Sequence, residues 1–293
     1  MSIAALDART LGEFPLPVIP EDGDKEDRGR LLVIGGSREV PGAAYLAAMC
    51  GLRVGAGKLQ VATAQSVAVP LAVAIPEARV IGHAETESGC LAESGVDGLI
   101  ALAKEAAAVV VGCGMQHGPP LDALIAALLS CGLEVPVVLD AAVLGSLADR
   151  DAALRDCGKA VLLPHPGEMK RLIGWEPDRI AADPLAAARE AAERYAAVSL
   201  IKGGQSYIVA PDGRAFRFEG GGVGLATSGS GDTLAGIVGG LAARGADPLT
   251  ACLWGVFIHG EAGRRLSRKV GRVGFLAREI VDMVPEIVSE FDG

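Results

Sequence analysis

Short runs of Val, Ile and Leu alternate with Ala-rich segments along most of this chain. Such an alternation is typical of βαβ units, and it predicts a mostly parallel sheet with helices on its faces. Six strands are expected, at residues 31–34, 59–62, 108–111, 137–139, 160–163 and 198–201. Residues 207–210 and 216–218, joined across Pro211-Asp212-Gly213, predict a β-hairpin at the edge of the sheet. The expected fold class is a three-layer α/β/α sandwich.

The composition favours one large domain. Of the 293 residues, 50% are hydrophobic and only 4% are aromatic, which suits parallel strands covered by Ala-rich helices. No Ser/Pro-rich linker or charge block divides the chain. The sequence therefore predicts an N-terminal extension at residues 1–29 and a single domain at residues 30–293.

Charge and cysteine content exclude several kinds of partner. The 27 basic and 36 acidic residues give a net charge of -9, and the sequence has no evident basic patch interleaved with aromatics. Nucleic acid is therefore not an expected partner. The six cysteines lack zinc-site spacing and are expected to be reduced. Residues 1–30 lack the plan of a signal peptide, and no apolar run reaches membrane-spanning length. A cytoplasmic protein with no membrane partner is expected.

The segment Thr227-Ser228-Gly229-Ser230-Gly231-Asp232 places small residues and one carboxylate directly before a helical pattern. That helix is predicted to be apolar on one face and to close near Gly245, with apolar positions spaced i, i+3, i+4 and i+7 at Leu234, Ile237, Val238 and Leu241. Free N–H groups at a helix N-terminus attract phosphate, and Gly lets the phosphate approach the backbone. Asp232 is then a candidate general base for a hydroxyl that attacks phosphorus. The same residues alone are also typical of a plain loop and N-cap.

Polar and Gly-rich residues follow the predicted strands one after another. In open α/β sheets the ligand crevice lies beyond the carboxyl ends of the strands, so these segments are expected to converge on one site. Each also has a simpler interpretation, as a tight turn, a helix cap or a first-turn charge. The segments are 35–37, 112–114, Asp140, 165–168 and 202–204.

The order of these motifs resembles the ribokinase-like superfamily, and within it the ADP/ATP-dependent NAD(P)H-hydrate dehydratases. The match runs from about residue 30 to about residue 280, and its most specific part is Pro164-His165-Pro166-Gly167-Glu168. The other motifs that carry it are Ile34-Gly35-Gly36-Ser37, Pro41-Gly42-Ala43-Ala44, Leu52-Arg53-Val54-Gly55-Ala56-Gly57, Val111-Gly112-Cys113-Gly114, Val138-Leu139-Asp140-Ala141, Lys202-Gly203-Gly204-Gln205-Ser206 and Ala226 to Asp232.

The resemblance implies repair of NADH or NADPH that has gained water across the nicotinamide ring, driven by ADP or ATP. It implies that the ring hydroxyl is phosphorylated and then expelled as phosphate. Asp232 would be the base, and the N–H groups of Gly229, Ser230 and Gly231 would stabilise the phosphoryl oxygens. It also places Ala43, Gly114, His165 and Asp232 against the hydrated dinucleotide. The nucleotide would contact Lys202, Gly203, Gly204, Gln205, Ser206 and Gly231.

Several roles stay open at this point. Lys202 is expected either to contact phosphate or to pair with a buried acid, and His165 either to contact substrate or to cap a helix. Mg²⁺ is the expected metal, with Glu168 as a candidate ligand through water. No motif supports a role for His83, His117 or His259.

The chain departs from the family pattern in places. The usual second Asp after the central strand is Ala142, the Gly-x-Gly-Leu-Gly pattern becomes Gly112-Cys113-Gly114-Met115-Gln116, and Gly222-Val223-Gly224 stands for Asn-Pro-Gly. A vitamin-precursor kinase of the same superfamily is therefore an alternative, and a nucleotide-binding regulatory protein without turnover is a second. The companion epimerase is expected to be a separate protein, and relatives suggest a homo-oligomer, a tetramer.

Overall fold

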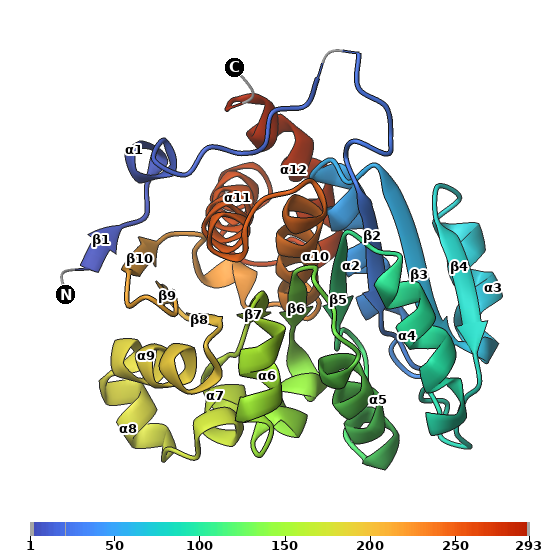
Figure 1. The fold of residues 1–293 in the computed structure, drawn as a ribbon. Helices are drawn as coiled ribbons and strands as arrows, with labels where there is room; N and C mark the ends of the chain where they lie inside the picture. The colour runs from blue at the N-terminus through green and yellow to red at the C-terminus, as the bar shows by residue number, and fades with distance from the viewer. Residues whose placement is uncertain (1–2, 21, 292–293) are drawn as a thin grey trace.

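The structure, a computed structural model, describes residues 3–20 and 22–291 of the chain. Met1 and Gly293, the outer limits of the two predicted segments, lie outside the described residues. Within the described part, ten strands form one sheet in the order β1-β10-β9-β8-β7-β6-β5-β2-β3-β4 (Figure 1). The strands are β1 Ile3–Ala5, β2 Arg30–Ile34, β3 Lys58–Ala64, β4 Arg79–His83, β5 Ala108–Val111, β6 Val137–Leu139, β7 Ala160–Leu162, β8 Val198–Ile201, β9 Gln205–Val209 and β10 Ala215–Glu219.

Helices connect most of these strands. The α-helices are α1 Ala8–Leu11, α2 Pro41–Arg53, α3 Gln65–Ala74, α4 Val96–Lys104, α5 Pro119–Ser130, α6 Asp151–Cys157, α7 Pro166–Ile173, α8 Pro177–Ala182, α9 Pro184–Tyr195, α10 Ser230–Ala243, α11 Pro248–Lys269 and α12 Ala277–Ser289. Short 3-10 helices are η1 Glu93–Gly95, η2 Ala141–Leu147 and η3 Val223–Leu225.

The predicted parallel sheet is confirmed. Strands β5, β6 and β8 have the bounds that the sequence predicts, because strands buried on both faces are largely apolar, and Ser199 of β8 is the one polar residue among these three strands. The predicted hairpin is confirmed as β9 and β10, with β9 antiparallel to both its neighbours. However, β1 pairs in parallel with β10, so the hairpin lies one strand inside the edge of the sheet. The edge strand comes from the predicted N-terminal extension.

Two helical layers cover the sheet. Successive side chains of a strand point to opposite faces, so Leu31 and Val33 enter one core whereas Leu32 and Ile34 enter the other. Residues of α2, α3, α10, α11 and α12 complete the first core, and residues of α4 to α9 complete the second. This arrangement is the expected three-layer sandwich (Figure 1).

The prediction that the helix after Asp232 has one buried face is wrong. Nearly every residue of α10 is buried, because the helix lies between the sheet and helices α2, α11 and α12. Its contact with α2 is so close that a Cβ atom at Gly236 would lie 2.1 Å from the Ala47 carbonyl oxygen. The helix ends at Ala243, and Gly245 follows with a φ of +100°, as the sequence predicts.

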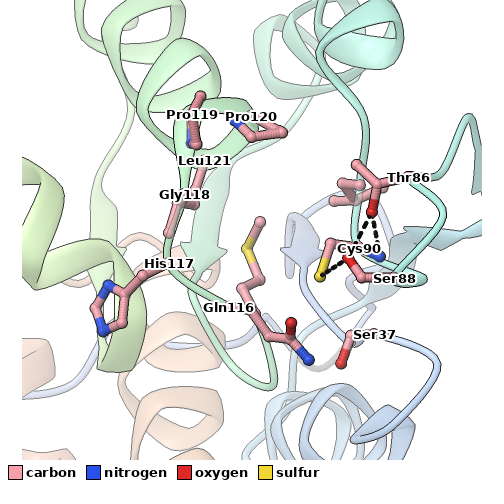
Figure 2. A pocket seen from close by; sticks show the side chains of 13 residues that line it. Ser37, Thr86, Ser88, Cys90, Gln116, His117, Gly118, Pro119, Pro120 and Leu121 are labelled. Carbon is pink, nitrogen blue, oxygen red and sulfur yellow. Dashed lines mark hydrogen bonds between the residues drawn. The ribbon is translucent and has the colours of Figure 1, made fainter.

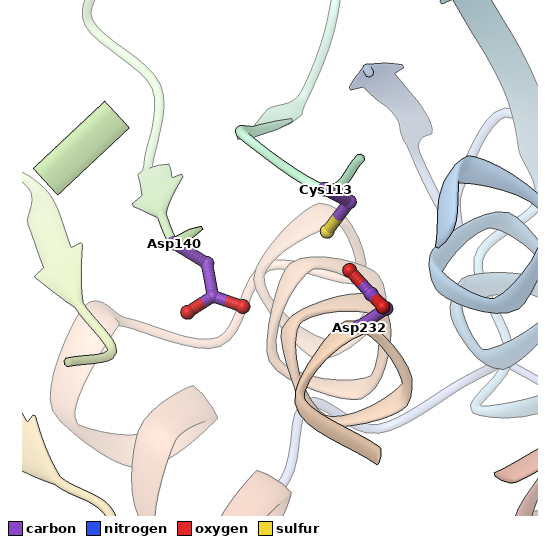
Figure 3. A group of neighbouring side chains, drawn as sticks. All are labelled: Cys113, Asp140 and Asp232. Atoms are coloured by element: carbon purple, nitrogen blue, oxygen red, sulfur yellow. The ribbon is translucent and has the colours of Figure 1, made fainter. Parts of the chain in front are cut away.

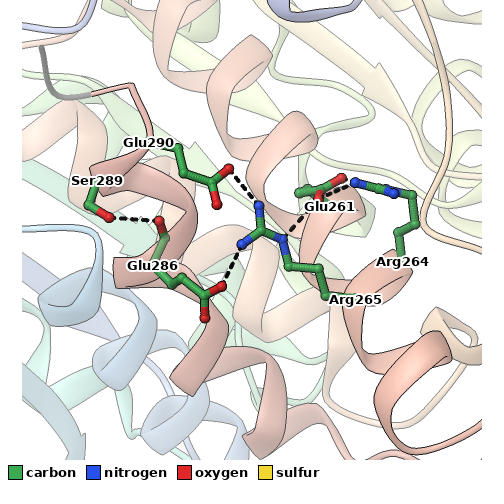
Figure 4. A network of polar contacts seen from close by, with 6 residues as sticks. All are labelled: Glu261, Arg264, Arg265, Glu286, Ser289 and Glu290. Carbon is green, nitrogen blue, oxygen red and sulfur yellow. Dashed lines mark hydrogen bonds and ion pairs between the residues drawn. The ribbon is translucent and has the colours of Figure 1, made fainter.

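An arginine joins the last two helices (Figure 4). Arg265 of α11 donates to Glu261 on its own helix at 2.9 Å, and to Glu286 and Glu290 at 2.8 and 2.6 Å. The last two carboxylates belong to α12 and the residue that caps its C-terminus. Because the guanidinium is only 22% exposed, the network fixes α12 against α11 more firmly than a fully solvated pair would.

Among the described residues, we find no helix with the length and apolarity needed to cross a membrane.

Candidate active site

The loops that follow the central strands meet at one end of the sheet, as the sequence predicts. The Gly36 N–H, after β2, donates to the Cys113 carbonyl after β5 at 2.7 Å. The Lys202 N–H, after β8, donates to the Pro164 carbonyl after β7 at 2.9 Å. The N-terminus of α10 faces the same end, since a Cβ atom at Gly231 would lie 3.5 Å from the Lys202 Nζ.

The start of α10 has the geometry expected of an anion hole. Gly229 caps the helix with a φ of 87°, a conformation that a side chain would strain. The Ser230 N–H donates to the Thr227 carbonyl at 3.2 Å, so this group is engaged inside the loop rather than free for phosphate. The N–H groups of Gly229 and Gly231 remain the candidate backbone donors. The Ser230 hydroxyl becomes the third candidate donor.

Asp232 lies in the first turn of α10 and forms a cluster with Cys113 and Asp140, in which Cys113 and Asp140 are buried and Asp232 is half-buried (Figure 3). One ligand atom from each residue lies within 4.8 Å of the others. Burial, followed by the negative charge of Asp140, raises the pKa of Asp232 to about 6, although a hydrogen bond from Cys113 and the charge of Lys202 oppose the shift. A carboxylate with this pKa is a stronger base than an exposed Asp and is still ionised near neutral pH.

Cys113 is a thiol and not a thiolate. Burial raises its pKa well above the usual range, and the two neighbouring carboxylates raise it further. The protonated sulfur can therefore donate to Asp232 and cannot act as a nucleophile. This contact orients the carboxylate of Asp232.

Lys202 pairs with Asp140, which was one of the two possibilities left open by the sequence. Its Nζ lies 2.7 Å from Asp140 Oδ1 and 4.0 Å from Glu168 Oε2. Burial lowers the pKa of Lys202, but the two acids more than compensate and the net shift is upward. The ammonium therefore stays charged beside the anion hole. The simpler interpretation of Asp140 as a helix cap is wrong, because its side chain makes no capping hydrogen bond to η2.

His165 caps α7. Its Nδ1 accepts from the Gly167 N–H at 2.9 Å, while Glu168 Oε2 accepts from the His165 N–H at 2.8 Å. The other oxygen of Glu168 lies 3.3 Å from His165 Nε2. The sequence left capping and substrate contact as alternatives; the cap is present, and the ring is still 55% exposed at the end of β7, where it can also contact a ligand.

The remaining predicted residues lie on either side of the cluster. Gly114 packs against Ala43, with only 2.9 Å between the Ala43 Cβ and a Cβ atom built at Gly114. Gly203, Gly204, Gln205 and Ser206 form the turn into β9, where the Gly203 N–H lies 3.4 Å from the Ser206 hydroxyl. The first pair lies on the β5 side of Asp232, and the turn lies on the β8 side.

No sequence motif selects His259, yet the structure places it against Ser230 at the start of α10. Its Nε2 lies 3.0 Å from the Ser230 hydroxyl and 3.0 Å from the Ser230 carbonyl oxygen. Burial lowers its pKa to about 4, so the ring is neutral. A histidine inside the apolar run of α11 was the available signal, since a buried polar group needs a partner.

This geometry suits transfer of a phosphoryl group to a hydroxyl. Asp232 can remove the hydroxyl proton, and the amide and hydroxyl groups of the anion hole can stabilise charge on phosphorus-bound oxygens. Lys202 supplies the positive charge beside them. Attack, base and charge stabilisation are thus all available within one cluster.

Comparisons with known proteins agree with this chemistry. A family model described as NAD(P)H-hydrate dehydratase matches residues 31–286. The ADP-dependent (S)-NAD(P)H-hydrate dehydratase of Xanthomonas campestris pv. campestris is 45% identical over 98% of this chain and 96% of its own length. A bifunctional NAD(P)H-hydrate repair enzyme of Moorella thermoacetica is 36% identical over 94% of this chain, but only 52% of that enzyme is covered. The ADP/ATP-dependent NAD(P)H-hydrate dehydratase of Bacillus subtilis, co-crystallised with ATP and Mg²⁺, superimposes with a TM-score of 0.84 at 27% identity, covering 99% of each chain.

Proposed function

The chain belongs to the NAD(P)H-hydrate dehydratase family, and from this premise we propose that it dehydrates hydrated NADH and NADPH with ADP or ATP. The enzyme is then a carbon–oxygen lyase of the hydro-lyase type. The observation that carries the proposal is the position of Asp232, a half-buried carboxylate with a raised pKa in the first turn of the helix whose N-terminus is the proposed anion hole.

The reaction follows from the chemistry of the leaving group. Hydroxide leaves poorly, so the ring hydroxyl oxygen first attacks phosphorus as Asp232 takes its proton, and the bond from phosphorus to the nucleotide breaks. The electron pair of the adjacent ring nitrogen then expels phosphate as the carbon–oxygen bond breaks. Loss of a proton from the neighbouring ring carbon restores the reduced nicotinamide. The balance is loss of water from the ring and cleavage of one phosphate bond of the nucleotide.

The two substrates are assigned to the two sides of Asp232. Ala43, Gly114 and the exposed ring of His165 are proposed to contact the hydrated dinucleotide. Gly231 and the turn at residues 203–206 are proposed to contact ADP or ATP. Lys202 acts at the boundary, because its ammonium is held by Asp140 but lies against Gly231.

Mg²⁺ is proposed as the metal, and two residues of the cluster fit it. The carboxylates of Asp140 and Asp232 offer the oxygen ligands that this ion prefers, whereas the Cys113 sulfur does not suit a hard cation. When bound, the ion supplies positive charge to the phosphate oxygens. Glu168 is proposed only for a contact through water, because both of its carboxylate oxygens face His165.

The alternative of a vitamin-precursor kinase is not favoured. The dehydratase family model covers residues 31–286, and the Xanthomonas dehydratase matches nearly the whole chain. A regulatory protein without turnover is disfavoured as well, because Asp232 and its helix N-terminus are both in place.

An absorbance assay at the reduced-nicotinamide band tests the proposal. The purified protein is given hydrated NADH with Mg²⁺ and either ADP or ATP, and recovery of absorbance that depends on one nucleotide is the expected result. The Asp232→Asn variant is expected to lose turnover and to keep nucleotide binding, which controls for misfolding. Nucleotide consumption with other alcohols and no recovery of absorbance would instead support the kinase.

We also propose a cytoplasmic location for the protein. We propose that it forms a homotetramer, and size-exclusion chromatography with light scattering would test this oligomeric state. We also propose functional partnership with a separate NAD(P)HX epimerase. The bifunctional name of the Moorella relative supports a coupling of the two activities.

A further inference from the structure

A cavity of about 210 Å³ opens beside the proposed active site, between three loops (Figure 2). The loops follow β2, β4 and β5, so the cavity lies at the same end of the sheet as Asp232. Whole sites for drug-sized ligands measure about 300–1,000 Å³, so this cavity is large enough only for part of a dinucleotide. It is a candidate subsite and not a complete binding site.

The lining of the cavity is uncharged. One side is apolar, formed by Met115 from the loop after β5 and by Pro119, Pro120 and Leu121 at the start of α5. The other side carries small polar side chains, at Ser37, Thr86, Ser88 and Cys90, and Leu91 follows Cys90 in the same loop. Among the described residues, no Lys, Arg, Asp or Glu lines the cavity.

The imidazole in the lining is engaged by an arginine outside it. His117 Nε2 lies 3.1 Å from Arg171 Nη1, and because a guanidinium only donates, this nitrogen is the acceptor. A phosphate group would find no positive charge in the cavity. A flat, neutral heterocycle with polar edges fits both of its sides.

The polar side is held in shape by its own hydrogen bonds. The Cys90 N–H donates to the Thr86 hydroxyl oxygen at 3.1 Å, and that oxygen lies 2.9 Å from the Ser88 hydroxyl (Figure 2). The Arg38 guanidinium, from the loop after β2, donates to the Glu87 carbonyl at 3.1 Å. The loop is therefore organised before a ligand arrives, which lowers the entropic cost of binding.

The cavity adjoins Gly114, one of the residues proposed to contact the dinucleotide. Gly36 and Met115 line it, and Gly114 lies between them, with a built Cβ 3.3 Å from the Gly36 Cα. The sheet order places β2 and β5 on one side of the Asp140 strand, and β8 with its Lys202 turn on the other. A ligand that reaches the cavity from Asp232 passes Gly114 and does not cross the turn at 203–206.

We propose that this cavity binds the purine base of the hydrated dinucleotide, the half that does not react. The inference rests on the proposed function, because the hydrated nicotinamide ring must occupy the space beside Asp232. The second base then needs an uncharged subsite that opens on the same side, and the cavity provides one. Its contacts would select a dinucleotide over a mononucleotide.

Filling the cavity tests the proposal. In Met115→Trp the larger side chain would fill the cavity from its apolar side. In Ser88→Trp it would fill the cavity from the exposed loop, and this second variant can be used if the first fails to fold. Val69→Trp, on the exposed outer face of α3, is the matched control. The substrates are hydrated NADH and hydrated reduced nicotinamide mononucleotide, which lacks the purine half.

The readout is the ratio of kcat/KM for the two substrates. The protein and its Val69→Trp variant are expected to favour the dinucleotide, and either cavity variant is expected to reduce that ratio by about tenfold or more. An unchanged ratio in both cavity variants would overturn the inference.

Binding separates this inference from the proposed function. The Kd of unhydrated NADH, followed by its own fluorescence, is expected to rise about tenfold in a cavity variant and to stay the same in Val69→Trp. If no substrate is dehydrated but binding responds in this way, the proposed function fails and the cavity assignment stands. If dehydration occurs and the Kd of NADH is the same in the cavity variants as in the unmodified protein, only the cavity assignment fails.

Discussion

The His259 Nε2 lies 3.0 Å from both the hydroxyl oxygen and the carbonyl oxygen of Ser230. A carbonyl oxygen only accepts, so Nε2 carries the proton and donates. The Ser230 hydroxyl oxygen then accepts from the same N–H, which leaves its own hydrogen free. We therefore expect His259 to be a positioning residue that directs the Ser230 hydroxyl toward a phosphoryl group at the start of α10.

Removal of this contact is expected to slow turnover. Ser230→Ala deletes the donor and should lower kcat by about 10²–10³, the usual loss for one such donor. His259→Ala should lower kcat by a smaller factor with the KM for nucleotide little changed. In the Ser230→Ala background, His259→Ala should add almost nothing, because both changes remove one interaction. Additive losses in steady-state kinetics would contradict the positioning role.

The pKa of Asp232 predicts an acid limb in the pH profile. The carboxylate must be ionised to take a proton, and its pKa is raised to about 6, so kcat/KM should fall about tenfold per unit below pH 6. Three neighbours face the carboxylate: Asp140 raises its pKa, whereas Cys113 and Lys202 lower it.

Asp140→Asn should therefore move the limb to lower pH, since the charge that disfavours ionisation is removed. Asp97→Asn, exposed on α4, is the control and should leave the limb in place. A limb at the same pH in all three proteins would remove Asp140 as a cause of the shift.

Breaking the pair of Lys202 and Asp140 on one side should destabilise the protein strongly. The Asp140 side chain is only 3% exposed, and Lys202→Met would leave its charge buried without a partner. We expect the free energy of unfolding to fall by about 3–5 kcal/mol. Adding Asp140→Asn should restore most of the loss, because the double variant buries no unpaired charge. Urea unfolding measures all three variants, and a loss under about 0.5 kcal/mol in Lys202→Met would refute the coupling.

The approach of α10 to α2 predicts intolerance of one methyl group. Gly236→Ala would place Cβ 2.1 Å from the Ala47 carbonyl oxygen, so the helices must separate, at a cost of about 1–3 kcal/mol or more. Gly42→Ala, on α2 with no atom within 4 Å of its new Cβ, should be neutral or stabilise by up to about 1 kcal/mol. Thermal unfolding compares the two variants. Equal melting temperatures would show that the helix contact relaxes freely.

The strands that the sequence predicts best are those buried on both faces. Residues 108–111 are an unbroken apolar run and residues 198–201 are apolar apart from Ser199, and both are strands with those bounds. Strand β4 at 79–83 was missed, because an outer strand with half-exposed side chains carries a weaker apolar signal. The one-faced interpretation of α10 was wrong because spacing shows which positions pack against the sheet but not that α2 and α11 cover the remaining side.

The sequence by itself determined the alternation of strands and helices, the strand-end segments and the Asp232 motif, because these depend on neighbours within a few residues. Only the tertiary structure decided the pairing of Lys202 with Asp140 and the place of His259 beside Ser230. These contacts join groups 62 and 29 residues apart. Contacts between distant groups depend on how whole layers pack, and local residue patterns do not encode that packing.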